Sequence, residues 1–132
     1  MTNYVKLRNQ FGDIDFIVAS ALTADPYIER SIRGVNTLVQ TPAEIVARKL
    51  HHRGARPTAR DLLDLAVVAG SEKNLSQLIS KPIRENGATL IEQCKSRHDL
   101  LEIEYNQLAT MDCEMTFQEC LDIVDGLIRV AQ

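Results

Sequence analysis

The sequence predicts an α+β fold: a small antiparallel β-hairpin or three-stranded sheet, followed by about five helices. Three observations support this prediction. An alternating apolar pattern opens the chain, capping sequences for helices begin at residue 41, and strands and helices do not alternate afterwards. Strands followed by helices are typical of α+β folds and not of a doubly wound parallel sheet.

The alternation of apolar residues predicts a β-hairpin over residues 4–19. A connector through Asp25-Pro26 leads to a short third strand over residues 35–40. Because successive side chains of a strand point to opposite faces, the second strand of the hairpin has two different faces. One is apolar and the other is acidic: Ile14, Phe16 and Val18 against Asp13 and Asp15.

Capping sequences set the helix starts. Thr41-Pro42-Ala43-Glu44 begins the first helix, which we expect to run to about Arg53 and to be closed by Gly54. A second helix starts after Thr58 and ends near Gly70. The other predicted helices are a short one within 71–79, broken near Pro82, a long amphipathic one over about 88–108, and one from the Thr116 capping box to about Val130.

The chain has 132 residues, of which 45% are hydrophobic and 25% are charged. This length and composition are those of one globular domain with a core of its own. We divide the single domain 1–132 into a strand-rich part (1–41), a helix pair (42–70) and a helical C-terminal part (71–132).

Composition also excludes several classes of protein. No apolar run approaches the roughly 20 residues that span a bilayer, and the first residues lack the apolar stretch of a signal peptide. The three cysteines (Cys94, Cys113 and Cys120) are odd in number and form no Cys-x-x-Cys pair. Such thiols are typical of a reducing compartment, so we expect a cytoplasmic protein without a membrane partner.

The net charge of −3 hides an asymmetry between two segments. Residues 42–61 carry five lysines and arginines against two acids, and residues 98–132 carry eight acids against one arginine. A solvated helical face explains each segment, and we favour that explanation. The functional alternative is that the basic segment binds an anion, such as a nucleotide or a nucleic acid.

Three side chains in or just after the basic segment need a further explanation. Lys49 emerges beside the apolar stripe of its helix, where a lysine either extends to water or reaches into a cleft. Asp61 is the third residue after the Thr58 cap, where a carboxylate satisfies free backbone amides. Asp64 is flanked by leucines beyond the first turn, so it needs a partner, either Arg60 or Lys49. A helix pair of this kind can bind a phosphate through its basic side chains.

Two motifs resemble the nucleotidyltransferase AbiEii/AbiGii toxin family, which belongs to the polymerase-β-like nucleotidyltransferase superfamily. They are Pro42-Ala43-Glu44-Ile45-Val46-Ala47-Arg48-Lys49-Leu50 and Arg60-Asp61-Leu62-Leu63-Asp64-Leu65. The stretch from Phe11 to Ala19 and the fragment His52-Arg53-Gly54 are also similar to this family. The resemblance covers residues 5–70 and extends only loosely into the helical remainder.

The resemblance implies a role for each matching residue. These residues are, for catalysis, Lys49, Asp61 and Asp64; for nucleotide phosphates, Lys49, Arg53 and Arg60; and for a metal ion, Asp15 in preference to Asp13. Complete family members use Mg²⁺ and a nucleoside triphosphate, and they transfer a nucleotide to an RNA or protein acceptor. They act as toxins, and their protein partner is an antitoxin.

One feature of the superfamily is missing from the sequence. An upstream Gly-Ser followed by an Asp-x-Asp pair holds two Mg²⁺ ions in such enzymes, and no Gly-Ser precedes Asp13 here. Asp13-Ile14-Asp15 lacks the glycine-rich turn that would cradle a triphosphate, so we do not assign it as that pair. We therefore expect the C-terminal portion of such an enzyme or a truncated relative, inactive alone and without a bound cofactor.

Two other functions fit the same residues. Residues 42–69 have the layout of a DNA-binding helix-turn-helix, although the two acids of its second helix would then face DNA phosphates. The chain is alternatively a non-catalytic interaction module. The histidines add no metal site, because His51 and His52 diverge by about 100° on a helix, and His98 is expected in a helix contact.

The last expectation concerns self-association. The apolar face of the predicted hairpin needs a cover, and free edges of a sheet tend to pair with another chain. We therefore expect a symmetric homodimer formed through the strand region. The acidic C-terminal helices should lie away from the contact, since they would repel one another.

Overall fold

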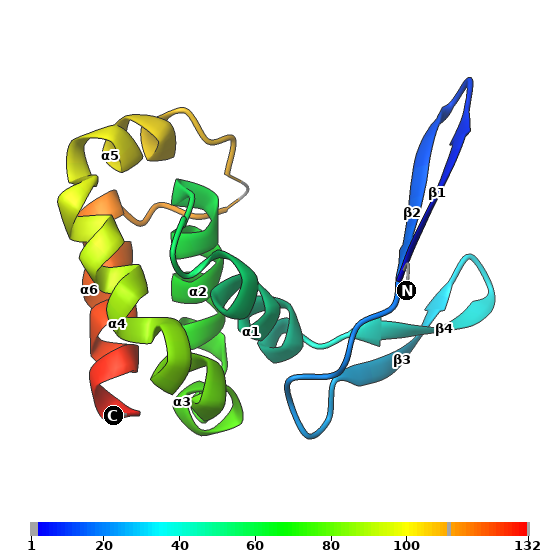
Figure 1. Ribbon diagram of the computed structural model, residues 1–132, viewed down its shortest axis with the longest axis horizontal. Coiled ribbons are helices and arrows are strands. Elements are labelled where there is room, and N and C mark those ends of the chain that lie inside the picture. The colour runs from blue at the N-terminus through cyan, green and yellow to red at the C-terminus, as the bar shows by residue number, and fades with distance from the viewer. Residues whose placement is uncertain (1–2, 111, 132) are drawn as a thin grey trace.

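The computed structural model describes residues 3–110 and 112–131, and it confirms the α+β fold class. The molecule has two regions, a pair of β-hairpins and a helical body, which lie at opposite ends of its long axis (Figure 1). In chain order the elements are β1 Tyr4–Asn9, β2 Gly12–Ile17, β3 Tyr27–Ile32, β4 Val35–Gln40, α1 Pro42–Arg53, α2 Ala59–Ser71, α3 Leu75–Leu78, α4 Ser80–Ser96, α5 His98–Asn106 and α6 Phe117–Val130.

Strands β1 and β2 form the predicted hairpin. Their cross-strand partners alternate between apolar pairs and oppositely charged pairs. The apolar pairs are Val5–Phe16 and Leu7–Ile14, and the charged pairs are Lys6–Asp15 and Arg8–Asp13. Since successive residues point to opposite faces, the hairpin has one apolar face and one charged face. The predicted separation of the two faces of β2 is therefore confirmed.

The prediction of a three-stranded sheet is wrong. In the described residues, β4 pairs with β3 and not with the first hairpin, so the fold has two separate two-stranded sheets. The turn between β3 and β4, Arg33-Gly34, has positive φ at both residues (50° and 80°), which is the geometry of a tight hairpin turn. Strand β3 is hard to recognise in the sequence because Glu29, Arg30 and Ser31 interrupt its apolar alternation.

Helices α1 and α2 begin where the capping sequences predict. At α2 the capping box is complete, because the side chains of Thr58 and Asp61 each accept a hydrogen bond from the other's amide. At α1 only half of the box forms. Thr41 Oγ1 accepts a bond from the amide of Glu44 at 3.2 Å, while the Glu44 carboxylate turns toward another segment of the chain.

Gly54 follows α1 as predicted, but with ordinary helical dihedral angles (φ −55°). Its importance is close packing, because a Cβ atom at this position would lie 2.7 Å from Cβ of Asn86 on α4. Helices α1 and α4 can therefore approach one another here only because residue 54 has no side chain.

The structure corrects the sequence prediction in the C-terminal half. The long helix expected over 88–108 is two helices, α4 and α5, which meet at Arg97 (φ −109°, ψ 25°). The apolar spacing continues through this break and so does not reveal it. Pro82 breaks no helix, because it lies in the first turn of α4, where its missing amide hydrogen is not needed. The described residues form six helices rather than five.

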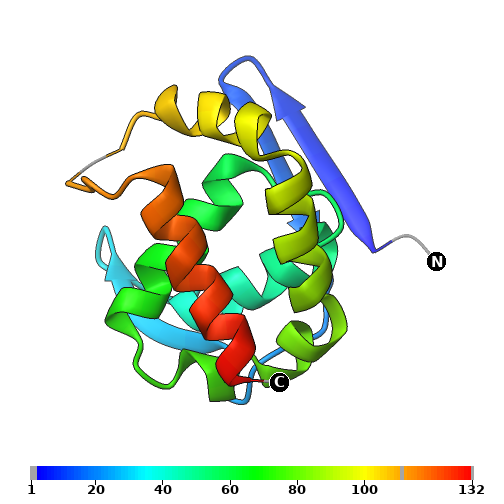
Figure 2. The ribbon, with the colours of Figure 1, turned by 90° about the vertical axis from the view of Figure 1, so that its left-hand side faces the viewer.

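One hydrophobic core fills the helical body. Its buried apolar side chains all lie between Ala43 and Ile128. Helix α2 is central, in contact with α1, α5 and α6 (Figure 2). In the part of the chain that the structure describes, neither hairpin contributes a buried hydrophobic residue. Among the same residues, no helix is long and apolar enough to cross a membrane.

Candidate functional site

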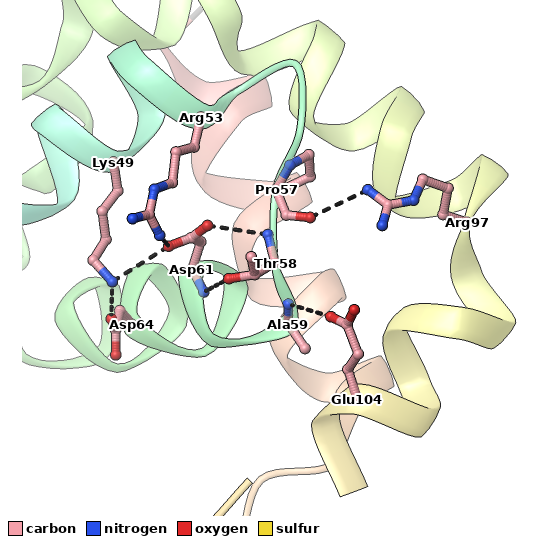
Figure 3. Close-up of polar contacts among 9 residues, drawn as sticks. All are labelled: Lys49, Arg53, Pro57, Thr58, Ala59, Asp61, Asp64, Arg97 and Glu104. Atoms are coloured by element: carbon pink, nitrogen blue, oxygen red, sulfur yellow. Dashed lines mark hydrogen bonds and ion pairs between the residues drawn. The ribbon is translucent and has the colours of Figure 1, made fainter. Parts of the chain in front are cut away.

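Helices α1 and α2 bring four of the predicted site residues together (Figure 3). Lys49 of α1 reaches across to α2, where its Nζ lies 2.5 Å from Asp64 Oδ2 and 3.3 Å from Asp61 Oδ1. Arg53, one turn further along α1, places Nη1 3.3 Å from the same Asp61 oxygen. We call these four residues the Lys49 cluster. Its two cations and two carboxylates balance in charge.

Asp61 lies at the centre of the Lys49 cluster. Its side chain is only 3% exposed. Oδ2 accepts a hydrogen bond of 3.0 Å from the amide of Thr58, and Oδ1 faces both cations. The sequence interpretation of Asp61 as a helix-capping residue is therefore correct but incomplete, because the same carboxylate also fixes the directions of Lys49 and Arg53.

The partner of Asp64 is Lys49 and not Arg60, the other partner that the sequence allowed. The Asp64 side chain is 34% exposed, so it faces solvent beside its lysine. Arg60 is exposed and makes no ion pair within residues 3–110 and 112–131. Its guanidinium is therefore available to a ligand.

A pocket of about 490 Å³ opens beside the Lys49 cluster. Arg60 and Asp64 form its charged side. The remaining lining comes from α1, α2 and the segment before α6, and it is mostly apolar: Pro42, Ile45, Val46, Leu63, Val67, Val68, Leu108, Ala109, Thr110 and Cys113. Ligand sites are commonly apolar hollows of roughly 300–1,000 Å³ with a few polar groups. This pocket and the Lys49 cluster together form the candidate site.

The structure does not bring Asp15 to this site. Asp15 accepts a hydrogen bond of 3.0 Å from the Tyr4 hydroxyl and lies 3.6 Å from Lys6 Nζ, both within its own hairpin. Asp13 likewise pairs with Lys6. Figure 1 shows this hairpin apart from α1 and α2, so no packing contact carries either acid to the pocket. Among the described side chains, no group of three or more His, Cys, Asp and Glu could hold a metal ion.

Glu44 is a buried polar residue that the sequence did not single out beyond its place in a capping box. Its carboxylate is 0% exposed and accepts hydrogen bonds from the amides of Leu22 and Thr23 and from the Thr23 hydroxyl, at 2.7 to 3.2 Å. Arg48 Nε lies 3.0 Å away. Burial raises the pKa of Glu44, but these hydrogen bonds and the arginine outweigh it and hold the pKa below its ordinary value.

Two further contacts missed in the sequence support the start of α2 (Figure 3). The amide of Ala59 donates to Glu104 Oε2 of α5 at 3.3 Å, and Arg97 donates to the carbonyl of Pro57 at 3.4 Å. Both partners lie at least 40 residues away in the chain, so no local pattern predicts them. They fix the helix that carries Asp61 and Asp64.

The remaining histidine and cysteine candidates have structural roles. His98 packs edge-on against Phe117, with 5.0 Å between ring centroids, which confirms the expected helix contact. Burial raises the pKa of Cys94 to about 11 and also raises the pKa of Cys120. Both thiols are therefore protonated at neutral pH and are poor nucleophiles.

Comparison with known proteins provides no relative from which a function could be transferred. No protein-family model, no curated protein and no solved structure matches this chain. The function must therefore be inferred from the Lys49 cluster, its pocket and the motifs of the sequence.

Proposed function

We propose that this chain is the nucleotide-binding half of a nucleotidyltransferase-like protein of the AbiEii/AbiGii toxin type. The ligand would bind in the pocket beside the Lys49 cluster. The pocket supports this proposal because its walls are mostly apolar and its charged side holds both Arg60 and Asp64. Asp64 is in turn paired with Lys49. A nucleotide is divided in the same way: one end is a base with apolar faces, and the other end carries charged phosphates.

Each basic residue has a distinct place in this proposal. Arg60 contacts phosphate first, because its guanidinium can bind two phosphate oxygens at once and has no carboxylate partner in the described chain. Lys49 and Arg53 approach from α1, in directions that Asp61 fixes. Asp64 accepts a hydrogen bond from the ligand or orients its reacting group.

The residues that line this pocket do not fit a resident Mg²⁺ ion. Asp64 is the one carboxylate among the residues that line the pocket, and the ammonium of Lys49 already occupies its Oδ2. Magnesium commonly binds through one or two carboxylates together with phosphate oxygens. We therefore assign no step of a reaction to a metal ion held by this chain.

Binding by this chain alone should be weak, and transfer should be absent. A phosphate must compete with Asp61 and Asp64 for Lys49 and Arg53, because these ion pairs already exist. The sequence also contains no Gly-Ser ahead of an Asp-x-Asp pair. Phosphate binding without activation of the attacking group gives no nucleotide transfer.

Calorimetric titration with each of the four common nucleoside triphosphates and Mg²⁺ tests the proposal. We expect weak binding that Lys49→Ala abolishes and Arg60→Gln reduces. His52→Ala is the matched control, because His52 is an exposed residue of the same helix that belongs neither to the pocket lining nor to the Lys49 cluster. Equal loss in the Lys49 and His52 variants, or binding that neither Lys49→Ala nor Arg60→Gln changes, would place the ligand elsewhere.

The proposal includes partners. The exposed apolar side chains of the hairpins support self-association through the strand region, as a homodimer. An antitoxin protein and an RNA acceptor are the partners that the sequence resemblance suggests, in a cytoplasmic setting that suits three free cysteines.

The hairpins equally favour an interaction module without a nucleotide site, which is the outcome if the titrations show no binding. The helix-turn-helix is less well supported, since six of the thirteen residues of α2, Asp61 among them, are buried in the helical body and cannot face DNA.

A further inference from the structure

The hairpin of β1 and β2 has one face that is largely charged. Lys6 Nζ lies 3.2 Å from Asp13 Oδ2 and 3.6 Å from Asp15 Oδ1. Arg8 Nε lies 3.8 Å from the same Asp13 oxygen, and the Tyr4 hydroxyl donates to Asp15. Two cations and two carboxylates cancel on this face, and its one apolar pair, Tyr4–Ile17, lies at the end away from the turn, where Ile17 is 66% exposed.

The opposite face is apolar and uncovered. Its five apolar side chains are each more than half exposed, from 51% to 76%, and no charged residue lies among them on the two strands: Val5, Leu7, Ile14, Phe16 and Val18. Val18 extends the face beyond β2, because its amide donates to the carbonyl of Asn3 at 2.8 Å. We call these five residues the hairpin face.

The described part of the chain does not cover the hairpin face. The core lies entirely within the helical body, and Figure 1 shows β1 and β2 extending away from it. An isolated two-stranded ribbon is marginally stable in water, and a hydrophobic face packed on a further layer is what stabilises it. Another surface must supply that layer.

We propose that a second copy of this chain covers the hairpin face, with the two ribbons packed face to face about a twofold axis. This inference rests on the self-association proposed above and is independent of the nucleotide site. Two apolar ribbon faces pack in the manner of two sheets, about 10 Å apart with their strands nearly aligned. A twofold axis makes the same residues face one another, so one surface serves both copies.

The distribution of charge favours a second copy as the occupant. The hairpin face has no charge with which an acidic or a basic partner could pair, and an uncharged surface meets its own copy without repulsion. The strongly acidic segment, which holds α5 and α6, lies at the far end of the long axis (Figure 1). Face-to-face packing of the hairpins therefore keeps the two acidic segments apart.

The size of the hairpin face sets the expected affinity. Two strands of six residues form a ribbon about 20 Å long and about 10 Å wide. This area is small beside the roughly 800 Å² per partner of a standard interface. The dimer should therefore be weak and reversible, with a dissociation constant on the order of 100 µM.

Sedimentation equilibrium over a concentration series, extended to several times that dissociation constant, tests the proposal. Val5→Thr combined with Phe16→Thr removes a cross-strand apolar pair from the hairpin face while keeping residues that favour strands. Tyr4→Thr combined with Ile17→Thr is the matched control, because it alters the adjacent cross-strand pair on the opposite face. Helical circular dichroism should be unchanged in both, since neither pair belongs to the core.

We expect the wild-type chain and the control to dimerise and the Val5/Phe16 variant to associate at least about tenfold more weakly. A wild-type chain that stays monomeric throughout would overturn the proposal. Equal weakening in both variants, or dimerisation that Val5→Thr/Phe16→Thr does not change, would also overturn it and would indicate pairing through strand edges. Lys49→Ala alters the nucleotide site and should leave the dimer intact. A failure of nucleotide binding and a failure of dimerisation can therefore be distinguished.

Discussion

The helical body buries its apolar side chains, whereas the two hairpins expose theirs. Val46 and Leu62 are fully buried, while Phe16 and Val35 are 54% and 64% exposed. Short connections fold the amphipathic helices onto one another, so each helix covers its neighbour. A two-stranded ribbon has no second layer within its own sequence. An apolar pattern therefore indicates which face is to be buried, but not which part of which chain buries it.

The largest expected effect tests where the stability of the chain resides. Leu62→Ala should lower the free energy of unfolding by about 2–5 kcal/mol, because it leaves a cavity at the centre of α2. Phe16→Ala should change it by less than about 0.5 kcal/mol, since this residue is outside the core. Urea unfolding followed by helical circular dichroism, at a concentration too low for association, measures both. A comparable loss in the Phe16 variant would mean that the hairpin packs on the body.

A second expected effect concerns the contact that joins the two regions. Glu44→Gln should destabilise the chain by about 1–3 kcal/mol, because the amides of Leu22 and Thr23 lose a charged acceptor. The pKa of Glu44 is lowered in the folded state. The stabilisation is therefore fully present above the ordinary pKa of 4.5 and is lost as the pH falls through the lower folded value.

Unfolding free energies measured from neutral pH downward should thus show the wild type and Glu44→Gln converging below pH 4.5. Glu92→Gln, at an exposed position of α4, is the control and should follow the wild type throughout. A constant difference between wild type and Glu44→Gln across this range would mean that the Glu44 charge does not hold the connector.

The smallest expected effect distinguishes two glycines within the helical body. Gly54→Ala should destabilise the chain by about 1 kcal/mol, because the new methyl group would overlap Cβ of Asn86. Gly126→Ala should stabilise it by about 0.5–1 kcal/mol, since nothing lies within 4 Å of the new atom and alanine is the better helix former. Thermal or urea unfolding compares the two. Equal effects would contradict close packing between α1 and α4.

The starts of α2 and α6 could be predicted because Thr58 and Thr116 form capping boxes with the residues three positions later in the chain. The hairpin faces could be predicted for the same reason, since alternation is a local property. The break between α4 and α5 at Arg97 could not be predicted, because the apolar spacing is the same on both sides of it. Strand β3 was missed because its central residues are polar.

The candidate site shows the same limit. Lys49 and Asp64 attract attention as charged residues beside apolar stripes, and their pairing was one of two alternatives. The hydrogen bonds from the connector to Glu44 could not be predicted, because the donors lie 21 and 22 residues away in the sequence. Nor could the distance of Asp15 from the pocket, which depends on whether the hairpin packs on the helices.

The hydrogen bonds of Glu44 also help to make the second hairpin a closed loop, with both of its ends held at α1. Glu44 binds the chain just before β3, and the amide of Thr41 donates to the carbonyl of Pro26 at 2.9 Å, so both ends of the segment meet at α1. Doubling the length of a closed loop costs only about 0.6 kcal/mol in entropy. The Arg33-Gly34 turn is therefore a place where insertions can accumulate in evolution, or where a foreign peptide can be displayed, while the helices keep their arrangement.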